Sequence, residues 1–361
     1  MGLPTLIFSL QKAAETVASR VSAGVVAMIL RDEKAQGLHT INRESDIPTE
    51  LGEANKAAIR RAMMGHITMP AVIYLSVIAA DATIESGFDA LAAHSYDYLV
   101  GPTDISEEDA TALAVLVAET REKRYVGKAV LPNVAADDEG VINFVASGIK
   151  AGDQTYTAAQ YASRIAGILA GTPAEGSATH AALKEVTGVD AVEKPDEAVD
   201  SGKLFLIDDG RQVKLSRAVT SKVTLKETEP EALKKIKLVA AVDLIRHHAV
   251  ATVEDEYLGK CANTYDNKCI LLVALSEYLT TLEAQDVLQA GKSAAELDAE
   301  AIRAYLLKAA EAAKDSAEVQ RIKALDDAAL RKEDTGSHVF IRLRARVLDA
   351  MEDFCITLEA Q

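Results

Sequence analysis

Two groups of residues in this chain have side chains that could bind a metal ion or carry out acid–base chemistry. His247 and His248 are adjacent, and Asp349, Glu352 and Asp353 gather carboxylates late in the sequence. Adjacent residues on a helix point about 100° apart, so these histidines do not face one metal ion as an i, i+4 pair does. We expect them at a solvated helix end, where cations are favoured. For the carboxylates, a calcium or catalytic pair is one alternative, but a salt-bridged or interface role is the expectation.

The motifs of common active sites are missing. The sequence contains no Gly-rich phosphate loop, no G-x-G-x-x-G between a strand and a helix and no G-x-S-x-G. The spacing of Cys261, Cys269 and Cys355 matches no zinc pattern, and we expect buried or half-buried reduced thiols. We therefore predict no catalytic, cofactor or metal site and no enzyme. An α/β nucleotide- or small-molecule-binding enzyme without a recognisable active site is the alternative.

The first part of the chain alternates between short β-branched runs and stretches with helical spacing. Strands are expected over residues 24–31, 71–80, 96–102, 125–133 and 142–147. Helices are expected over residues 49–64, 84–93 and 106–124, the last with a capping-box-like start at Ser106 and Asp109. This alternation predicts an α/β domain with a largely parallel sheet.

The pattern changes after residue 200. Asp209 and Gly210 separate two strand-like runs and predict a hairpin. Helices are expected over residues 231–248, 267–285 and 339–353, and one or two solvated amphipathic helices over 293–325. The predicted fold is thus an N-terminal α/β domain plus a C-terminal α+β domain, with extended strand-forming arms at both ends. The predicted division is an arm at 1–20, an outer α/β domain at 21–150, a connecting helix and loop at 151–200, an inner α+β domain at 201–353 and a strand arm at 354–361.

The arms are the chain's unusual feature. Phe354, Ile356 and Leu358 alternate with Cys355, Thr357 and Glu359, which is the two-residue period of a half-buried strand. Near the other end, Leu6, Ile7 and Phe8 form a second β-prone run. An unpaired apolar strand promotes sticking in a monomer. In a polymer built by strand addition, the same strand supplies main-chain hydrogen bonds and specificity.

Charge and composition limit the classes of partner that we expect for this chain. The formal net charge of −16 disfavours nucleic acid and anionic membranes. At 49% hydrophobic residues the chain can bury cores, but it has no uninterrupted apolar run of about 18 residues, so we expect no direct membrane insertion. The start shows no basic leader or cleavage site, which predicts synthesis in the cytoplasm.

Four co-linear stretches resemble the sheath subunits of contractile injection machines, in the compact subfamily of Gram-positive phages and prophages. The machines are myovirus-type phage tails and phage-tail-like bacteriocins. The stretches are "GLPTLIFSLQKAAETVASRVSAGVVAMIL" at 2–30, "SRIAGILAGTPAEGSATH" at 163–180, "DEYLGKCANTYDNKCILLVALSEYL" at 255–279 and "DTGSHVFIRLRARVLDAMEDFCITLEA" at 334–360. Where such sheaths often read Arg-Gly-Val-Asn-Ser, this chain reads Arg-Ala-Val-Thr-Ser at 217–221, so no contact role is carried over to Thr220.

The resemblance implies a structural protein that polymerises helically around a tail tube and contracts to drive the tube through an envelope. It implies partners at the ends of the sheath, namely baseplate and tail terminator proteins, and arms that add strands to neighbouring copies. The C-terminal strand would be received by a domain that includes the hairpin around Gly210. The protein would be made in the bacterial host cytoplasm and assembled in a phage tail or an extracellular tail-like particle.

In such sheaths the second domain faces the tube, and this chain has basic residues there on two predicted helices. The candidate tube-facing residues are Lys234, Lys235, Lys237, Arg342, Arg344 and Arg346. A solvated helix face is the alternative explanation for these charges.

Overall fold

The computed structural model describes residues 23–123, 127–227 and 229–355. The predicted strand residues Leu6, Ile7, Phe8, Ile356, Thr357 and Leu358 lie outside these ranges. The described residues form two compact units. The larger unit comprises residues 23–244 and 349–355, and the smaller unit comprises residues 245–348.

A seven-stranded sheet forms the centre of the larger unit, in the order β10-β6-β5-β4-β1-β3-β2. All neighbours are parallel except the edge strand β2, which is antiparallel to β3. The strands are β1 (Val25–Arg31), β2 (Gly37–Ile41), β3 (Val72–Ile78), β4 (Tyr98–Val100), β5 (Lys128–Pro132), β6 (Val141–Phe144) and β10 (Lys203–Leu204). The predicted largely parallel α/β sheet is confirmed.

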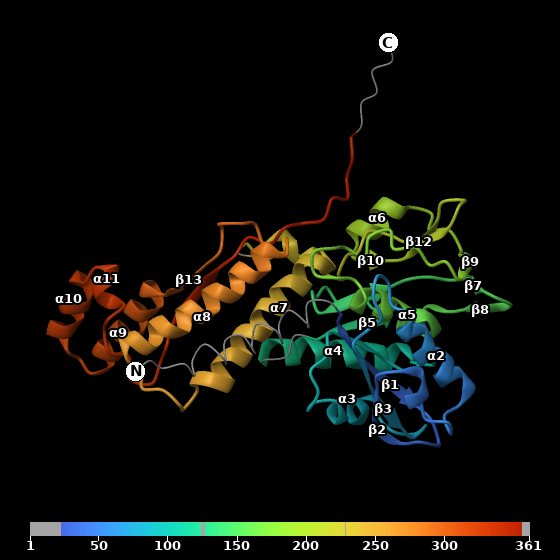
Figure 1. Ribbon diagram of the computed structural model, residues 1–361, viewed down its shortest axis with the longest axis horizontal. Helices are drawn as coiled ribbons and strands as arrows, with labels where there is room; N and C mark the ends of the chain where they lie inside the picture. Colours follow the sequence, from blue (N-terminus) through green and yellow to red (C-terminus); the bar gives the residue numbers. More distant parts are fainter. Residues whose placement is uncertain (1–22, 124–126, 228, 356–361) are drawn as a thin grey trace, which may run out of the picture. The chain divides into compact units, whose positions relative to one another are not determined.

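Helices cover both faces of this sheet (Figure 1). Alternation along β1 sends Val26 and Met28 into a core with α2 and α5, while Ala27 and Ile29 enter a second core with α3 and α4. The helices are α2 (Glu53–Met63), α3 (Ile84–Ala90), α4 (Glu107–Lys123) and α5 (Ala158–Ala170), with a short α6 (Pro195–Asp200) and two 3₁₀ turns, η1 (Glu44–Asp46) and η2 (Glu231–Lys234).

Two small antiparallel sheets complete the larger unit. One contains β7 (Ile149–Ala151), β8 (Gln154–Tyr156) and β9 (Val186–Gly188), and the other pairs β11 (Leu206–Asp208) with β12 (Val213–Leu215). The second is the hairpin predicted around Gly210, which has φ +79°. Asp209 closes its turn by accepting the Gln212 N–H at 2.9 Å. The hairpin prediction is confirmed.

The smaller unit is mainly helical. Helix α7 (Ile236–Thr252) leads into it and continues as a π-helix, η3 (Val253–Tyr257). It also contains α8 (Tyr265–Ala284), β13 (Ala294–Leu297), α9 (Ala299–Ala312), α10 (Ser316–Ala324), α11 (Asp327–Leu330) and β14 (Ile341–Arg344). Strands β13 and β14 pair antiparallel. None of the helices within the described ranges combines the length and apolar character that crossing a bilayer requires.

Four expectations need correction. Residues 339–353 form no helix, because the alternation of Ile341 and Leu343 with arginines places 341–344 in a ladder with β13. The helical stretch expected over 293–325 begins only at Ala299. Cys261 and Cys355 are exposed rather than buried. The division also differs from the expected one, because β10 completes the large sheet by pairing with β6 and the unit extends to residue 244.

A buried charge cluster attaches α7 to the sheet of the larger unit. Asp243 on α7 accepts two hydrogen bonds from Arg121 at 2.9 Å and one from Lys128 at 2.8 Å. The side chains of Arg121, Lys128 and Asp243 are only 9%, 2% and 7% exposed. Arg121 lies on α4 and Lys128 begins β5, so one carboxylate connects three elements.

Replacing Asp243 by asparagine should strongly destabilise the larger unit, because two desolvated cations would lose their counter-charge. We expect a loss of about 3–5 kcal/mol in the free energy of unfolding, measured in urea by circular dichroism. Asp109→Asn is the matched control, since its pair with Arg31 is more exposed and should contribute about 1 kcal/mol or less. Equal losses for both variants would contradict this role for Asp243.

Candidate functional site: the anchored C-terminal segment

The structure does not assemble the two histidines into a metal site. His247 and His248 lie on α7, and the His248 ring contacts the Tyr278 ring with centroids 3.6 Å apart and the ring planes tilted by 33°. Within the described parts of the chain, no three His, Cys, Asp or Glu side chains are grouped so as to hold a metal ion. His248 therefore contributes a ring contact within the smaller unit, and both histidines lie within α7 rather than at the expected helix end.

The late carboxylates, in contrast, come together with cations of the larger unit. Residues 349–353 are not helical, so these side chains do not lie at the end of the helix that was expected over 339–353. Lys235 donates to Asp349 at 2.5 Å and to Glu352 at 3.2 Å. Arg217 pairs with Asp353 and approaches Glu352 at 3.8 Å. The expected salt-bridged role of the acidic group is what the geometry shows.

Glu352 is the centre of this cluster, and its side chain is only 6% exposed. One of its oxygens, Oε1, accepts hydrogen bonds from Thr179 at 2.6 Å and from Ser177 at 3.0 Å. The loop is shaped to present both hydroxyls: the Thr179 N–H donates to Ser177 Oγ at 3.1 Å, and the Ala218 N–H donates to Thr179 Oγ1 at 3.0 Å. The other oxygen, Oε2, faces Lys235, so both oxygens are satisfied.

Burial alone would raise the pKa of Glu352, but the hydrogen bonds from Thr179, Lys235 and Ser177 outweigh it and hold the pKa below its ordinary value. For Lys235, burial acts to lower the pKa, and the bonds to Asp349 and Glu352 raise it above its ordinary value. The cluster therefore favours the ionised form of both partners.

Side chains alone attach this segment. Among the described residues, 349–355 form no main-chain to main-chain hydrogen bond, whereas Leu348 just before them donates to the Val287 carbonyl at 2.9 Å. Met351 and Phe354 flank Glu352 and are 87% and 71% exposed. The C-terminal segment is thus anchored at one buried carboxylate and presents apolar side chains outward.

The six candidate tube-facing cations fall into two sets. In the larger unit, Lys234 ends η2, Lys235 belongs to the cluster just described, and Lys237 is buried and donates to the Glu175 carbonyl at 2.7 Å. In the smaller unit, the arginines lie on and after strand β14 and not on a helix. Arg342 pairs with Asp298 at 2.9 Å and with Glu300 at 2.8 Å, Arg344 pairs with Glu296, and Arg346 is exposed.

Sequence reasoning missed the partners of Glu352. Ser177, Thr179 and Arg217 lie more than a hundred residues away from it in the chain, and hydroxyl side chains in a polar loop give no signal of a distant acceptor. The short Ser-x-Thr spacing predicts a local turn at most.

The anchor should release in acid. A lowered folded-state pKa means that Glu352 contributes stability above its ordinary pKa of 4.5, and that this contribution is lost as the pH falls through the lowered value. For Lys235 the sign is opposite: its pKa is raised in the folded state, so its contribution to stability is lost only as the pH rises above 10.5. A spin label on Cys355, with Cys261 and Cys269 replaced by serine, should therefore become mobile below pH 4.5.

Glu352→Gln serves as the control for this titration, because it keeps an acceptor for Ser177 and Thr179 but cannot ionise. Its label should show no transition in the same range of pH. Asp349, Asp353, Lys235 and Arg217 are the other charged groups that face Glu352, and they are unchanged in this variant. A transition of equal size in Glu352→Gln would assign the pH dependence to another group.

Comparisons with known proteins agree with this architecture. The family model for the phage tail sheath protein central domain matches residues 79–221. The tail sheath protein of Clostridium phage phiCD119 is 31% identical over 366 residues, covering 99% of both chains. Two solved structures share the fold. The sheath tail protein Lin1278 from Listeria innocua has a TM-score of 0.68 at 14% identity, over 81% of this chain and 93% of that one.

The second is a contracted-state sheath complex of an extracellular contractile injection system, PVC, with a TM-score of 0.64 at 12% identity, over 94% of this chain and 92% of that one. At these identities the two structures speak for the fold, while the phage relative matches end to end at the level of sequence. This chain belongs to the phage tail sheath protein family.

Proposed function

We propose that copies of this chain polymerise into a helical sheath around a tail tube by exchanging terminal strands, and that the sheath contracts to drive the tube through a cell envelope. The family membership supports a structural subunit, and the alternative of an α/β enzyme has no support among the relatives. We expect the protein to be made in the host cytoplasm and then assembled into a particle of the relatives' kind, either a phage tail or an extracellular contractile system. Tube, baseplate and terminator proteins are the expected partners.

The observation that carries strand exchange is the way the described chain ends. Glu352 is held on its own subunit, and two residues later Phe354 is 71% exposed. The sequence then continues with Ile356 and Leu358 at strand spacing. An apolar strand that starts from an exposed position is suited to pair with another copy, and such head-to-tail contacts produce open helices.

The smaller unit offers a receiving sheet. Strands β13 and β14 form a sheet that has no third strand among the described residues, and two strands alone are marginally stable in water. The hairpin around Gly210 was expected to belong to the receiving domain. The edge of β12 that faces away from β11 is already occupied, because the Leu183 N–H donates to the Val213 carbonyl and the Leu215 N–H donates to the Ala181 carbonyl. We therefore favour the β13–β14 sheet as the receiver.

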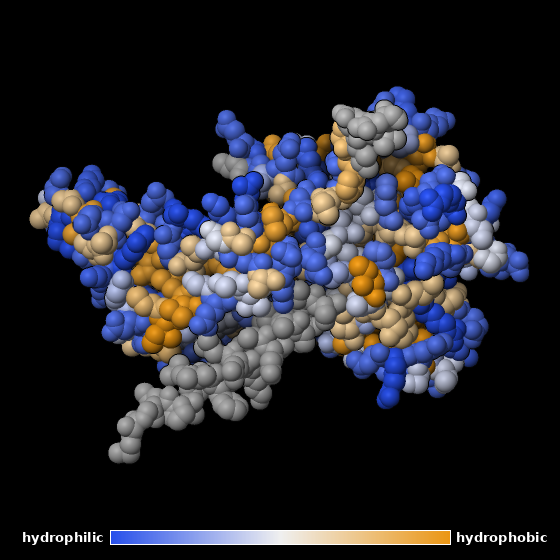
Figure 2. All heavy atoms as spheres, turned by 45° about the horizontal axis from the view of Figure 1, so that its top comes forward, coloured by the Kyte–Doolittle hydropathy of each residue, from blue (hydrophilic) through white to orange (hydrophobic). Residues whose placement is uncertain are grey.

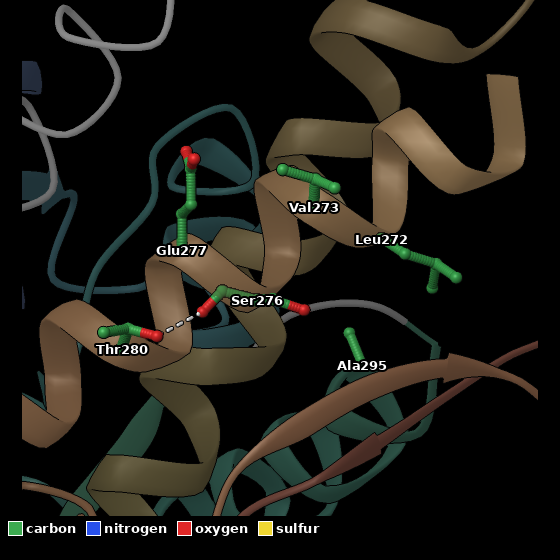
Figure 3. Close-up of a pocket in the computed structure, with 6 residues that line it drawn as sticks. All are labelled: Leu272, Val273, Ser276, Glu277, Thr280 and Ala295. Atoms are coloured by element: carbon green, nitrogen blue, oxygen red, sulfur yellow. Dashed lines mark hydrogen bonds between the residues drawn. The ribbon is translucent and has the colours of Figure 1, made fainter. Parts of the chain in front are cut away.

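A pocket beside β13 could take apolar side chains of an incoming strand. Its volume is about 470 Å³, and Figure 3 shows its lining on α8, with Ala295 contributed by β13. Leu272 and Val273 provide apolar surface, and Val273 is 57% exposed. The face drawn in Figure 2 is mainly hydrophilic and carries several apolar patches. The rest of the lining is polar, from Ser276, Glu277 and Thr280. A partly apolar pocket beside an open sheet edge combines the two features that strand addition uses.

Deleting residues 355–361 should leave the subunit folded and abolish polymerisation. Each donated strand would lose several ladder hydrogen bonds of about 0.5–1.5 kcal/mol and the burial of Ile356 and Leu358, at about 1.5–3 kcal/mol each. Thr357→Pro should act similarly, because it removes one donor and keeps both apolar residues. Both variants should keep the circular-dichroism spectrum and melting of the parent and sediment as monomers where the parent forms tubes.

Tubes formed normally by the truncated chain would show that the strand is not the link. A truncated chain that fails to fold would instead place the strand in its own subunit's sheet. Asp353→Ala provides a full-length control with the strand intact, and it should form tubes.

The tube-facing role of the basic residues is a second part of the proposal. Lys235, Lys237, Arg342 and Arg344 have internal partners, so reversing them would disturb the fold as well as any tube contact. Lys234 and Arg346 form no ion pair within the described residues and make the cleaner test.

Lys234→Glu with Arg346→Glu should weaken sheath binding to the tube, most clearly at low salt, because exposed charge contacts are screened as ionic strength rises. Co-assembly with purified tube, followed by co-sedimentation across a salt series, measures this. Lys226→Glu, at a position that is 80% exposed and outside the candidate set, is the control. Equal binding by parent and double variant at low salt would exclude a tube contact for these two residues.

A further inference from the structure

The chain passes between its two units twice, and one ion pair joins the two segments that make these passages. Residues 245–348 form an insertion in the larger unit, entered through α7 and left at residue 348. Lys235 directly precedes α7, and Asp349 is the first residue after the insertion. Their 2.5 Å contact therefore joins the segment that leads into the smaller unit to the segment that returns from it.

The returning segment is fixed further along by Glu352. This carboxylate receives hydrogen bonds from Ser177, Thr179 and Lys235, which come from separate parts of the larger unit. Ionised acceptors make the stronger class of hydrogen bond, and three donors on one side chain define its position. Since 349–355 have no main-chain partners among the described residues, these side-chain bonds set where the segment lies.

We propose that Glu352, with Lys235, Ser177 and Thr179, is a clamp that holds the base of the C-terminal strand on the subunit that donates it. The inference rests on strand exchange as proposed above and assigns it a positioning residue. A strand held at its base explores less space before it pairs, so less order is lost when the neighbouring copy receives it. Tension between copies would pass through the clamp into the seven-stranded unit.

The clamp has a measurable geometry. Glu352 is the last buried attachment before the label, and Cys355 lies three residues beyond it along the chain; the pair of Asp353 with Arg217 is not counted, because Asp353 is 79% exposed. Without Glu352 the next attachment to the larger unit is the pair of Asp349 with Lys235, and the free segment grows to six residues. The reach of a flexible chain grows with the square root of its length, so the label's spread should increase about 1.4-fold.

The experiment uses the full chain carrying Cys261→Ser and Cys269→Ser. Asp196→Cys, at an exposed position on α6, provides the second labelling site. Spin labels at positions 196 and 355 give a distance distribution by pulsed electron resonance. Glu352→Ala should widen it about 1.4-fold, and Glu352→Gln should lie between Glu352→Ala and the parent, because it keeps the hydroxyl acceptor. Asp353→Ala is the matched control, since losing only the exposed pair with Arg217 should leave the distribution close to that of the parent.

Folding and assembly provide the second readout. Lys235 keeps Asp349 as a partner in Glu352→Ala, so no buried cation is left unpaired and the melting temperature should stay close to that of the parent. Tubes of Glu352→Ala should lose subunits on dilution at least about tenfold faster than the parent, and tubes of Asp353→Ala less than about twofold faster. If Glu352→Ala does not fold, Glu352→Gln replaces it, with the same direction of change in both readouts and a smaller size.

The outcomes separate the clamp from strand exchange itself. A distance distribution in Glu352→Ala that matches the parent overturns the clamp, whatever the tubes do. A wider distribution with unchanged subunit loss means that the segment is held but the holding does not serve assembly, which also overturns the proposal. Normal tubes from the chain lacking residues 355–361 would refute strand donation, and that result does not depend on the label.

Discussion

The rest of the structure depends on one buried carboxylate. Asp243 lies between Arg121 and Lys128, all nearly excluded from solvent, and its charge is needed to keep two cations inside the protein. The cluster can form only when α4, β5 and α7 are all in place, so it couples the central sheet to the helix that leads into the smaller unit. Apolar packing tolerates small shifts between elements, whereas three desolvated charges require their bonding geometry.

A second charge cluster, around Glu352, holds the segment that returns from the smaller unit. Around Glu352 the protein uses side-chain contacts in place of a β-ladder, and the returning segment forms no main-chain to main-chain hydrogen bond within the described residues. A subunit in a polymer must hold its own end and still offer a strand to a neighbour. Side-chain attachment at Glu352, followed by the exposed Phe354, meets both requirements.

Local pattern was enough to predict much of the larger unit. β1 and β3 are short apolar runs that tolerate burial on both faces, and the hairpin at Gly210 follows from a turn that needs positive φ. The same reasoning failed at β14, whose Ile341 and Leu343 fit either a helical or an alternating pattern until β13 supplies a ladder. It also misjudged Cys261 and Cys355, because exposure depends on neighbours that are remote in the chain.

The sequence by itself determined the α/β class of the first domain, the hairpin and, through full-length resemblance, the sheath family, because periodicity and turn chemistry are local and the resemblance is spread over nearly the whole chain. Only the tertiary structure decided that residues 245–348 are an insertion and that Glu352 meets Ser177, Thr179 and Lys235. A buried carboxylate needs donors, and nothing in the chain near Glu352 indicates which distant segment will provide them.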